Sequence, residues 1–154
     1  MTILFPGLVT VLIPFGFVLE KSQLSMEEWL LPHFAATFLI LLGVTILGRC
    51  IWEFANWGKG TLAPFDAPTQ LVVQGIYKYV RNPMYLGVYL ILIGEAWFFQ
   101  SLALVTWLGV FFLLSSLVVI LYEERQLQEQ FGETYTEYRN QVRRWIPGKP
   151  YKQN

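Results

Sequence analysis

Four apolar stretches dominate this 154-residue chain, and they constrain its fold more than any other feature. They run approximately over residues 3–19, 29–52, 84–99 and 102–122. A helix needs about 20 apolar residues, within a range of about 17 to 25, to cross the hydrocarbon core of a bilayer. Hydrophobic residues make up 55% of the chain, more than in an ordinary soluble domain. We therefore predict an all-α fold: an integral membrane helical bundle with about four transmembrane helices.

The segments between these stretches predict how the helices are connected. Only Gln100 and Ser101 separate the last two stretches, which indicates a tight hairpin of antiparallel helices. Residues 56–83 are rich in glycine and proline, which favours a loop. After residue 122, apolar side chains recur at steps of three and four, which predicts an amphipathic C-terminal helix on the membrane surface or against the bundle. These apolar positions are Leu127, Phe131, Tyr135, Tyr138 and Val142.

The charge balance and the two residue types that occur only once limit the classes of function that we expect. Eleven basic residues balance eleven acidic ones, so we expect no nucleic-acid partner. Ten of the eleven basic residues, all except Lys21, follow the second or fourth stretch or lie at their ends. Because lysine and arginine collect on the cytoplasmic side, we expect a multi-pass protein with both termini cytoplasmic. Cys50 and His33 are the only residues of their types, so we predict no disulfide and no metal site.

Two polar constellations lie at this same predicted side. In GIYKYVRNPMYLG (75–87), Pro83 suits the first turn of a helix, whose N-terminus attracts anionic groups, beside Asn82 and Tyr85. The paired Glu123 and Glu124 end the fourth stretch, where a carboxylate is costly unless it faces a cavity or a partner. They could hold the hydroxyls or the amine of a cofactor. The residues alone equally allow purely structural interpretations. The first motif could be a helix N-cap with interfacial tyrosines, and the two glutamates could lie on a solvated helix end.

The order of these motifs supports a more specific hypothesis. GTLAPFDAPTQLVVQGIYKYVRNPMYLG (60–87), followed by EERQLQEQFGETYTEYRNQVRRWIP (123–147), resembles the membrane-embedded methyltransferase superfamily. That superfamily includes isoprenylcysteine carboxyl methyltransferases and phospholipid N-methyltransferases. The resemblance implies S-adenosyl-L-methionine as methyl donor, bound on the cytoplasmic side between the last two helices and the C-terminal segment. The implied cofactor-binding residues are Thr69, Gln70, Leu71, Val72, Tyr77, Asn82, Pro83, Met84, Tyr85 and Glu123.

We expect Glu123, Glu124 and Asn82 to be the catalytic residues. If the acceptor is an amine, Glu124 or Glu123 would take its proton. The chain departs from the prenylcysteine enzymes at two positions. Asn82 stands where they typically have histidine, and Val119 stands where they have an arginine that contacts the substrate. Arginine suits a carboxylate and valine does not, so these residues do not favour methyl esterification of a prenylated cysteine.

We therefore expect a membrane methyltransferase of the isoprenylcysteine carboxyl methyltransferase type that takes a lipophilic or lipid-like acceptor from the bilayer. A phospholipid N-methyltransferase is the alternative, and a non-catalytic membrane protein that binds a ligand or assists assembly is an alternative of another class. We expect one membrane domain over residues 1–154. It would comprise two N-terminal spans (1–58), a cytosolic cofactor loop (59–83), a helical hairpin (84–122) and the amphipathic helix (123–147).

Overall fold

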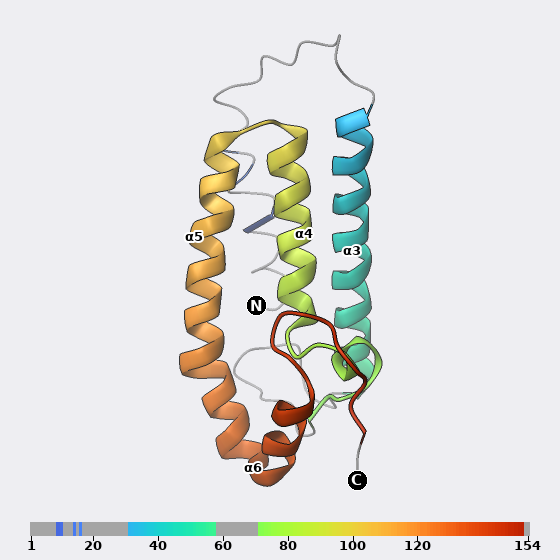
Figure 1. Cartoon of the computed structure of the whole chain (residues 1–154), viewed down its shortest axis with the longest axis vertical. Coiled ribbons are helices and arrows are strands. Elements are labelled where there is room, and N and C mark those ends of the chain that lie inside the picture. The colour runs from blue at the N-terminus through green and yellow to red at the C-terminus, as the bar shows by residue number, and fades with distance from the viewer. Residues whose placement is uncertain (1–8, 11–13, 15, 17–30, 58–70, 153–154) are drawn as a thin grey trace.

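The computed structural model describes residues 9–10, 14, 16, 31–57 and 71–152. All regular structure in these residues is helical, as predicted. The long helices are α3 (Leu31–Trp57), α4 (Pro83–Phe98), α5 (Leu102–Val118) and α6 (Glu124–Gln141). A short 3-10 helix, Gly75–Lys78, precedes α4, and a π-helical turn, Val119–Glu123, joins α5 to α6. Helix α4 lies between α3 and α5, and α6 lies beyond the end of α5 (Figure 1).

Within the described part of the chain, two helical segments are long and apolar enough to cross a membrane, His33–Trp57 and Leu102–Gln141. Helix α4 is apolar but has only 16 residues. The apolar side chains of these segments are largely exposed: Phe38 is 65%, Leu113 64% and Leu121 65% exposed. A core helix of a soluble protein would bury such residues, whereas lipid matches them. The expected span at 3–19 lies almost wholly outside the described residues, so the count of about four spans stays a prediction.

Helices α3 and α4 pack closely because small residues face one another. A Cβ atom added at Gly43 of α3 would lie 2.6 Å from the carbonyl oxygen of Gly87 in α4. One added at Gly94 would lie 2.6 Å from Cγ1 of Ile40. Lipid tails are as apolar as the helix side chains, so the hydrophobic effect does not drive helices together within a membrane. Close backbone approach instead provides van der Waals contact that holds them together. These glycines therefore fix α4 against α3.

The predicted hairpin between α4 and α5 is present. Gln100 adopts a positive φ of 46°, and the hydroxyl of Ser101 accepts a hydrogen bond from the Leu104 amide at 3.4 Å to cap α5. The helix predicted over 29–52 continues to Trp57, and the predicted amphipathic helix ends at Gln141 rather than near 147. It is also bent at Gly132, where φ is 52° and ψ is −121°, a conformation that glycine tolerates.

Residues 142–152 leave α6 in an extended path and return toward the 3-10 helix. Val142 has extended backbone angles. The amides of Gly148 and Tyr151 then donate to the carbonyls of Tyr79 and Lys78, each at 2.9 Å. In Figure 1 this return segment crosses the lower end of α4. The residues after Gln141 therefore make long-range backbone hydrogen bonds instead of continuing the helix.

Candidate active site

The junction at the start of α4 sets the position of the first constellation. Pro83 occupies the first turn of α4, where its missing N–H costs no hydrogen bond, and it is fully buried. Asn82 precedes it but makes no side-chain cap. Its amide nitrogen instead donates to the carbonyl oxygen of Arg144 at 3.4 Å. The junction is therefore attached to the C-terminal segment as well as to α4.

Tyr85 and Glu123 meet across the bundle. Tyr85 lies in the first turn of α4, and its hydroxyl donates to Oε1 of Glu123 at 2.6 Å. Glu123 ends the π-helical turn, 38 residues further along the chain. A hydrogen bond to an ionised carboxylate is among the stronger ones in proteins. This contact brings together one residue from each of the two motifs that the sequence singled out.

The π-helical turn separates the directions of the two adjacent glutamates. In a π-helical turn the hydrogen bonds join residues i and i+5, which makes the turn wider than that of an α-helix. Such turns are frequent at functional sites. Glu123 faces Tyr85, whereas Glu124, the first residue of α6, faces two arginines. The two carboxylates therefore have different surroundings.

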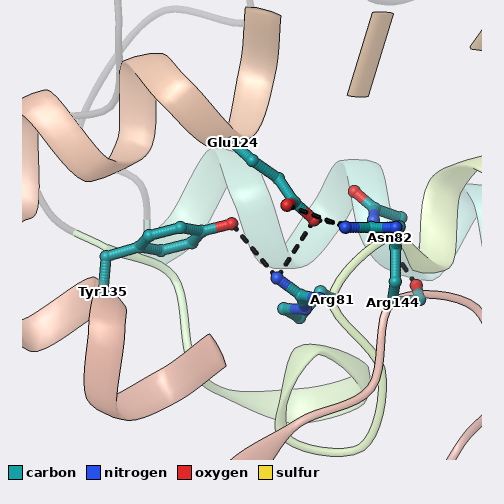
Figure 2. A network of polar contacts seen from close by, with 5 residues as sticks. All are labelled: Arg81, Asn82, Glu124, Tyr135 and Arg144. Atoms are coloured by element: carbon teal, nitrogen blue, oxygen red, sulfur yellow. Dashed lines mark hydrogen bonds and ion pairs between the residues drawn. The ribbon is translucent and has the colours of Figure 1, made fainter. Parts of the chain in front are cut away.

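Glu124 is the centre of a buried ion-pair network (Figure 2). Its Oε1 lies 3.0 Å from Nη1 of Arg81 and accepts from Nε of Arg144 at 2.7 Å, while its Oε2 accepts from Nη2 of Arg144 at 3.0 Å. The Glu124 side chain is 8% exposed and that of Arg81 10%. Arg81 also donates to the hydroxyl of Tyr135 at 3.4 Å. Both oxygens of Glu124 are thus engaged by cations.

The C-terminal segment closes over residues 77–82. The Arg81 amide donates to the carbonyl of Arg143 at 3.0 Å, and the hydroxyl of Tyr138 donates to the carbonyl of Tyr77 at 2.6 Å. Leu71 packs against the cluster that Tyr138 belongs to. That buried cluster comprises Tyr135, Tyr138, Val142 and Tyr151. The segment before α4 is therefore held by α6 and the residues after it.

Trp145 reaches back from this segment to the helices. Its ring centroid lies 6.1 Å from that of Tyr85, 5.8 Å from Tyr89 and 6.2 Å from Phe112. Tyr89 in turn shares a 2.7 Å hydrogen bond with Ser115 of α5. These four rings form an aromatic cluster beside the Tyr85–Glu123 pair. Ring faces of this kind attract cations by about 0.5 to 2 kcal/mol.

The structure places the other residues of the expected site less centrally. Met84 lies half-buried in the first turn of α4, and Val72 is buried ahead of the 3-10 helix. Tyr77 is directed to α3, where its hydroxyl lies near the thiol of Cys50. Burial, and next the nearby thiol, raise the pKa of Tyr77 well above its ordinary value. Thr69 and Gln70 lie outside the described residues.

Sequence reasoning missed several residues that shape this region. Arg81 and Arg144 meet at Glu124, and Arg81 also contacts Tyr135. Trp145 instead contacts Tyr85. These contacts join residues far apart in the chain, which no local pattern reveals. The buried Glu53 of α3 was missed as well; the available signal was its spacing of four residues from Arg49 near the end of an apolar helix. Among the described residues, no three His, Cys, Asp or Glu side chains gather as a metal site. The local chemistry is that of carboxylates, hydroxyls and aromatic faces.

Comparison with known proteins agrees with this chemistry. The phospholipid methyltransferase family matches residues 31–134, more than half of the chain. The chain belongs to the phospholipid methyltransferase family. The matched range includes α3, α4, α5, the Tyr85–Glu123 pair and Glu124, whereas Arg144 and Trp145 lie beyond it.

An uncharacterized protein of Haemophilus influenzae is 42% identical to the chain over 66 residues, which cover 41% of this chain and all of that protein. No solved structure matches the chain. Membership of this family indicates methyl transfer in general, with a donor of the S-adenosylmethionine type. Together with the exposed apolar helices, it indicates association with a membrane.

Proposed function

We propose that the protein is a membrane-embedded methyltransferase that uses S-adenosyl-L-methionine and methylates a lipid-like acceptor taken from the bilayer. The observation that carries this proposal is the 2.6 Å contact between Tyr85 and Glu123. It joins the two motifs at one end of helices whose apolar side chains are exposed. A site there borders both lipid and water, as a soluble donor and a lipid-like acceptor require.

The residues at this end suit the proposed donor, which supplies a methyl group on a positively charged sulfur. Glu123 offers a carboxylate for hydroxyls or an amine, and Tyr85 orients that carboxylate. The faces of Tyr89 and Trp145 suit a cation. Asn82, Pro83 and Met84 would line the same junction, and Leu71 and Val72 lie before it. Holding the reactants in line is the main task of such a site, because alignment alone supplies about 7 to 11 kcal/mol of barrier lowering.

Residue 119 favours an amine over a carboxylate as the acceptor. Val119 lies at the position where the prenylcysteine enzymes carry a substrate-binding arginine, and it is 1% exposed, so it offers no cation. Glu123 is a carboxylate and would repel an acceptor carboxylate, whereas it can take the proton of an amine. N-methylation of an amine-bearing phospholipid is therefore the form of the proposal that these residues support best.

The two glutamates would then have different roles. Glu123 is the proton acceptor, because only Tyr85 is hydrogen-bonded to it among the described contacts. Glu124 is a positioning residue, because both of its oxygens are bound by arginines. The arginines in turn hold Asn82 and the C-terminal segment in place. The distribution of basic residues supports a cytoplasmic site and cytoplasmic termini, within one membrane domain.

Two measurements on the purified protein test this proposal. Isothermal titration with S-adenosyl-L-methionine should show binding, and no binding by a protein with intact helical circular dichroism would overturn the proposal. Transfer of an isotope-labelled methyl group should then be measured with phosphatidylethanolamine, with phosphatidylglycerol and with a prenylated cysteine. We expect label only in the first. Binding without transfer to any lipid of a cell extract would support a non-catalytic ligand-binding protein instead.

A further inference from the structure

A shallow hollow lies at the end of α3, and neither Tyr85 nor Glu123 lines it. It is a hollow of about 410 Å³ between α3 and the turn that precedes α4. None of its lining residues belongs to α4, α5 or α6. They are Arg49, Glu53, Gly75, Ile76, Lys78 and Tyr79. None of these six residues is among the residues expected to bind the methyl donor or to catalyse transfer.

The one acid of this hollow is already engaged within the protein. Glu53 is 1% exposed; its Oε1 accepts from Nε of Arg49 at 2.7 Å, and its Oε2 accepts from the Ile76 amide at 3.0 Å. Lys78 is exposed and forms no ion pair within the described part of the chain. The hollow therefore contains two basic side chains and one carboxylate, which pairs with Arg49. The hollow carries a net positive charge that a further anion would balance.

The surroundings of the hollow indicate the depth of lipid headgroups. Trp52 and Tyr79 are 52% and 46% exposed, and the guanidinium of Arg49 lies 4.7 Å from the ring centroid of Trp52. Half-exposed tryptophan and tyrosine beside basic residues, at the end of an apolar helix, are typical of a membrane–water interface. Toward the N-terminus of α3, Val44 is 52% and Leu41 60% exposed, so the helix presents apolar side chains on the bilayer side of the hollow's depth.

We propose that this hollow binds the phosphate group of an anionic glycerophospholipid from the adjacent leaflet. Arg49 and Lys78 would bind the phosphate oxygens, and the exposed apolar side chains of α3 would contact the acyl chains. A soluble anion could satisfy the charges but would leave that apolar surface uncovered. The bound lipid stabilises the fold, because Arg49 and Glu53 connect the hollow to the turn at Gly75 and Ile76. It is not a methyl acceptor, since a lipid such as phosphatidylglycerol has no amine.

Native mass spectrometry and thermal unfolding of the full chain in detergent micelles test this site. Phosphatidylglycerol should bind more tightly than phosphatidylcholine and should raise the unfolding midpoint. Lys78→Gln should lower the affinity for phosphatidylglycerol about fivefold, the effect of one basic side chain near an anionic surface. Lys78→Arg should retain it. Both substitutions leave the Arg49–Glu53 pair in place, so the fold is retained.

Arg125→Gln is the matched control, because Arg125 is 79% exposed on α6 and lies 3.9 Å from Glu129. The proposal is overturned if Lys78→Gln and Arg125→Gln weaken phosphatidylglycerol binding equally, or if the two lipids bind alike. Inorganic phosphate provides the third arm of the experiment. If it stabilises the protein as much as phosphatidylglycerol does, the site takes a free anion and the lipid assignment is wrong.

Discussion

The carboxylate of Glu53 in α3 lies directly against Gly75, so that a Cβ atom at position 75 would overlap it. Gly75 also has a φ of 56°, which side-chain-bearing residues rarely adopt. The contact allows Glu53 to accept a hydrogen bond from Ile76, one residue further on. A single glycine therefore lets α3 hold the turn that leads into α4.

Gly75→Ala should destabilise the protein through this contact. The left-handed conformation costs alanine about 1–2 kcal/mol, and the buried carboxylate of Glu53 must also move. Thermal unfolding in micelles should show a lower midpoint. Gly109→Ala in α5 is the matched control, because nothing lies within 4 Å of the added Cβ, and it should raise stability by about 0.5–1 kcal/mol. Equal midpoints for the two variants would contradict this role of Gly75.

Tyr85→Phe should weaken donor binding without unfolding the protein. The substitution removes one hydrogen bond to a carboxylate, worth about 1.5–3 kcal/mol, so the affinity for S-adenosyl-L-methionine should fall about tenfold or more. Isothermal titration measures this directly. Tyr122→Phe serves as control, since Tyr122 precedes Glu123 in sequence but is 63% exposed, and it should bind the donor like the original protein. If Tyr85→Phe also binds normally, the pair does not form the donor site.

Glu124→Gln should destabilise the C-terminal segment more than it weakens the binding of the methyl donor. Removing this charge leaves Arg81 buried beside Arg144 without a carboxylate. The free energy of unfolding should fall by about 3 kcal/mol. This is the lower end of the range for a buried pair, because the Arg144 side chain is 28% exposed. Thermal unfolding and limited proteolysis after residue 141 should both report the loss. Glu129→Gln, at a side chain that is 75% exposed, should cost below about 1 kcal/mol. A catalytic role for Glu124 would instead reduce turnover with stability unchanged.

Alkaline pH should destabilise the protein through Tyr77. Its pKa is raised in the folded state, chiefly by burial, so folding keeps the phenol neutral. The corresponding stabilisation is fully present below the ordinary pKa of 10.0 and is lost as pH rises above it. Thermal midpoints measured from pH 8 to 11 should therefore fall less steeply for Tyr77→Phe than for the original protein. Parallel curves would show that Tyr77 ionises equally in both states.

The sequence predicted those parts of the fold that local rules determine. Pro83 at the start of α4 and the turn at Gln100 and Ser101 follow from backbone chemistry, and both lie where expected. The bend at Gly132 was not expected, because an isolated glycine within a helical pattern does not reveal whether it adopts a positive φ. The end of α6 at Gln141 depends on bonds to residues about 60 positions earlier.

The sequence predicted which residues belong to the candidate site better than it predicted the contacts between them. The motifs suggested Tyr85 and Glu123, and the structure shows them in contact; their roles in donor binding and catalysis stay predictions. The partners of Glu124 could not be read from the sequence, since Arg81 lies before three intervening helical elements and Arg144 after a bend. Nothing local in the sequence distinguishes Trp145 from other aromatic residues, and only the returning segment brings it to Tyr85.

The π-helical turn also decides how this end of the bundle responds to a change in chain length. Each residue of an ordinary α-helix rotates its successors by about 100°, and a π-helical turn holds one residue more than an α-helical turn. Deleting one residue within Val119–Glu123 would therefore restore ordinary winding with α6 close to its present orientation. Deleting one residue within α5 would instead rotate Glu123 and Glu124 together away from Tyr85 and the arginines. The deletion in α5 should be the more harmful of the two.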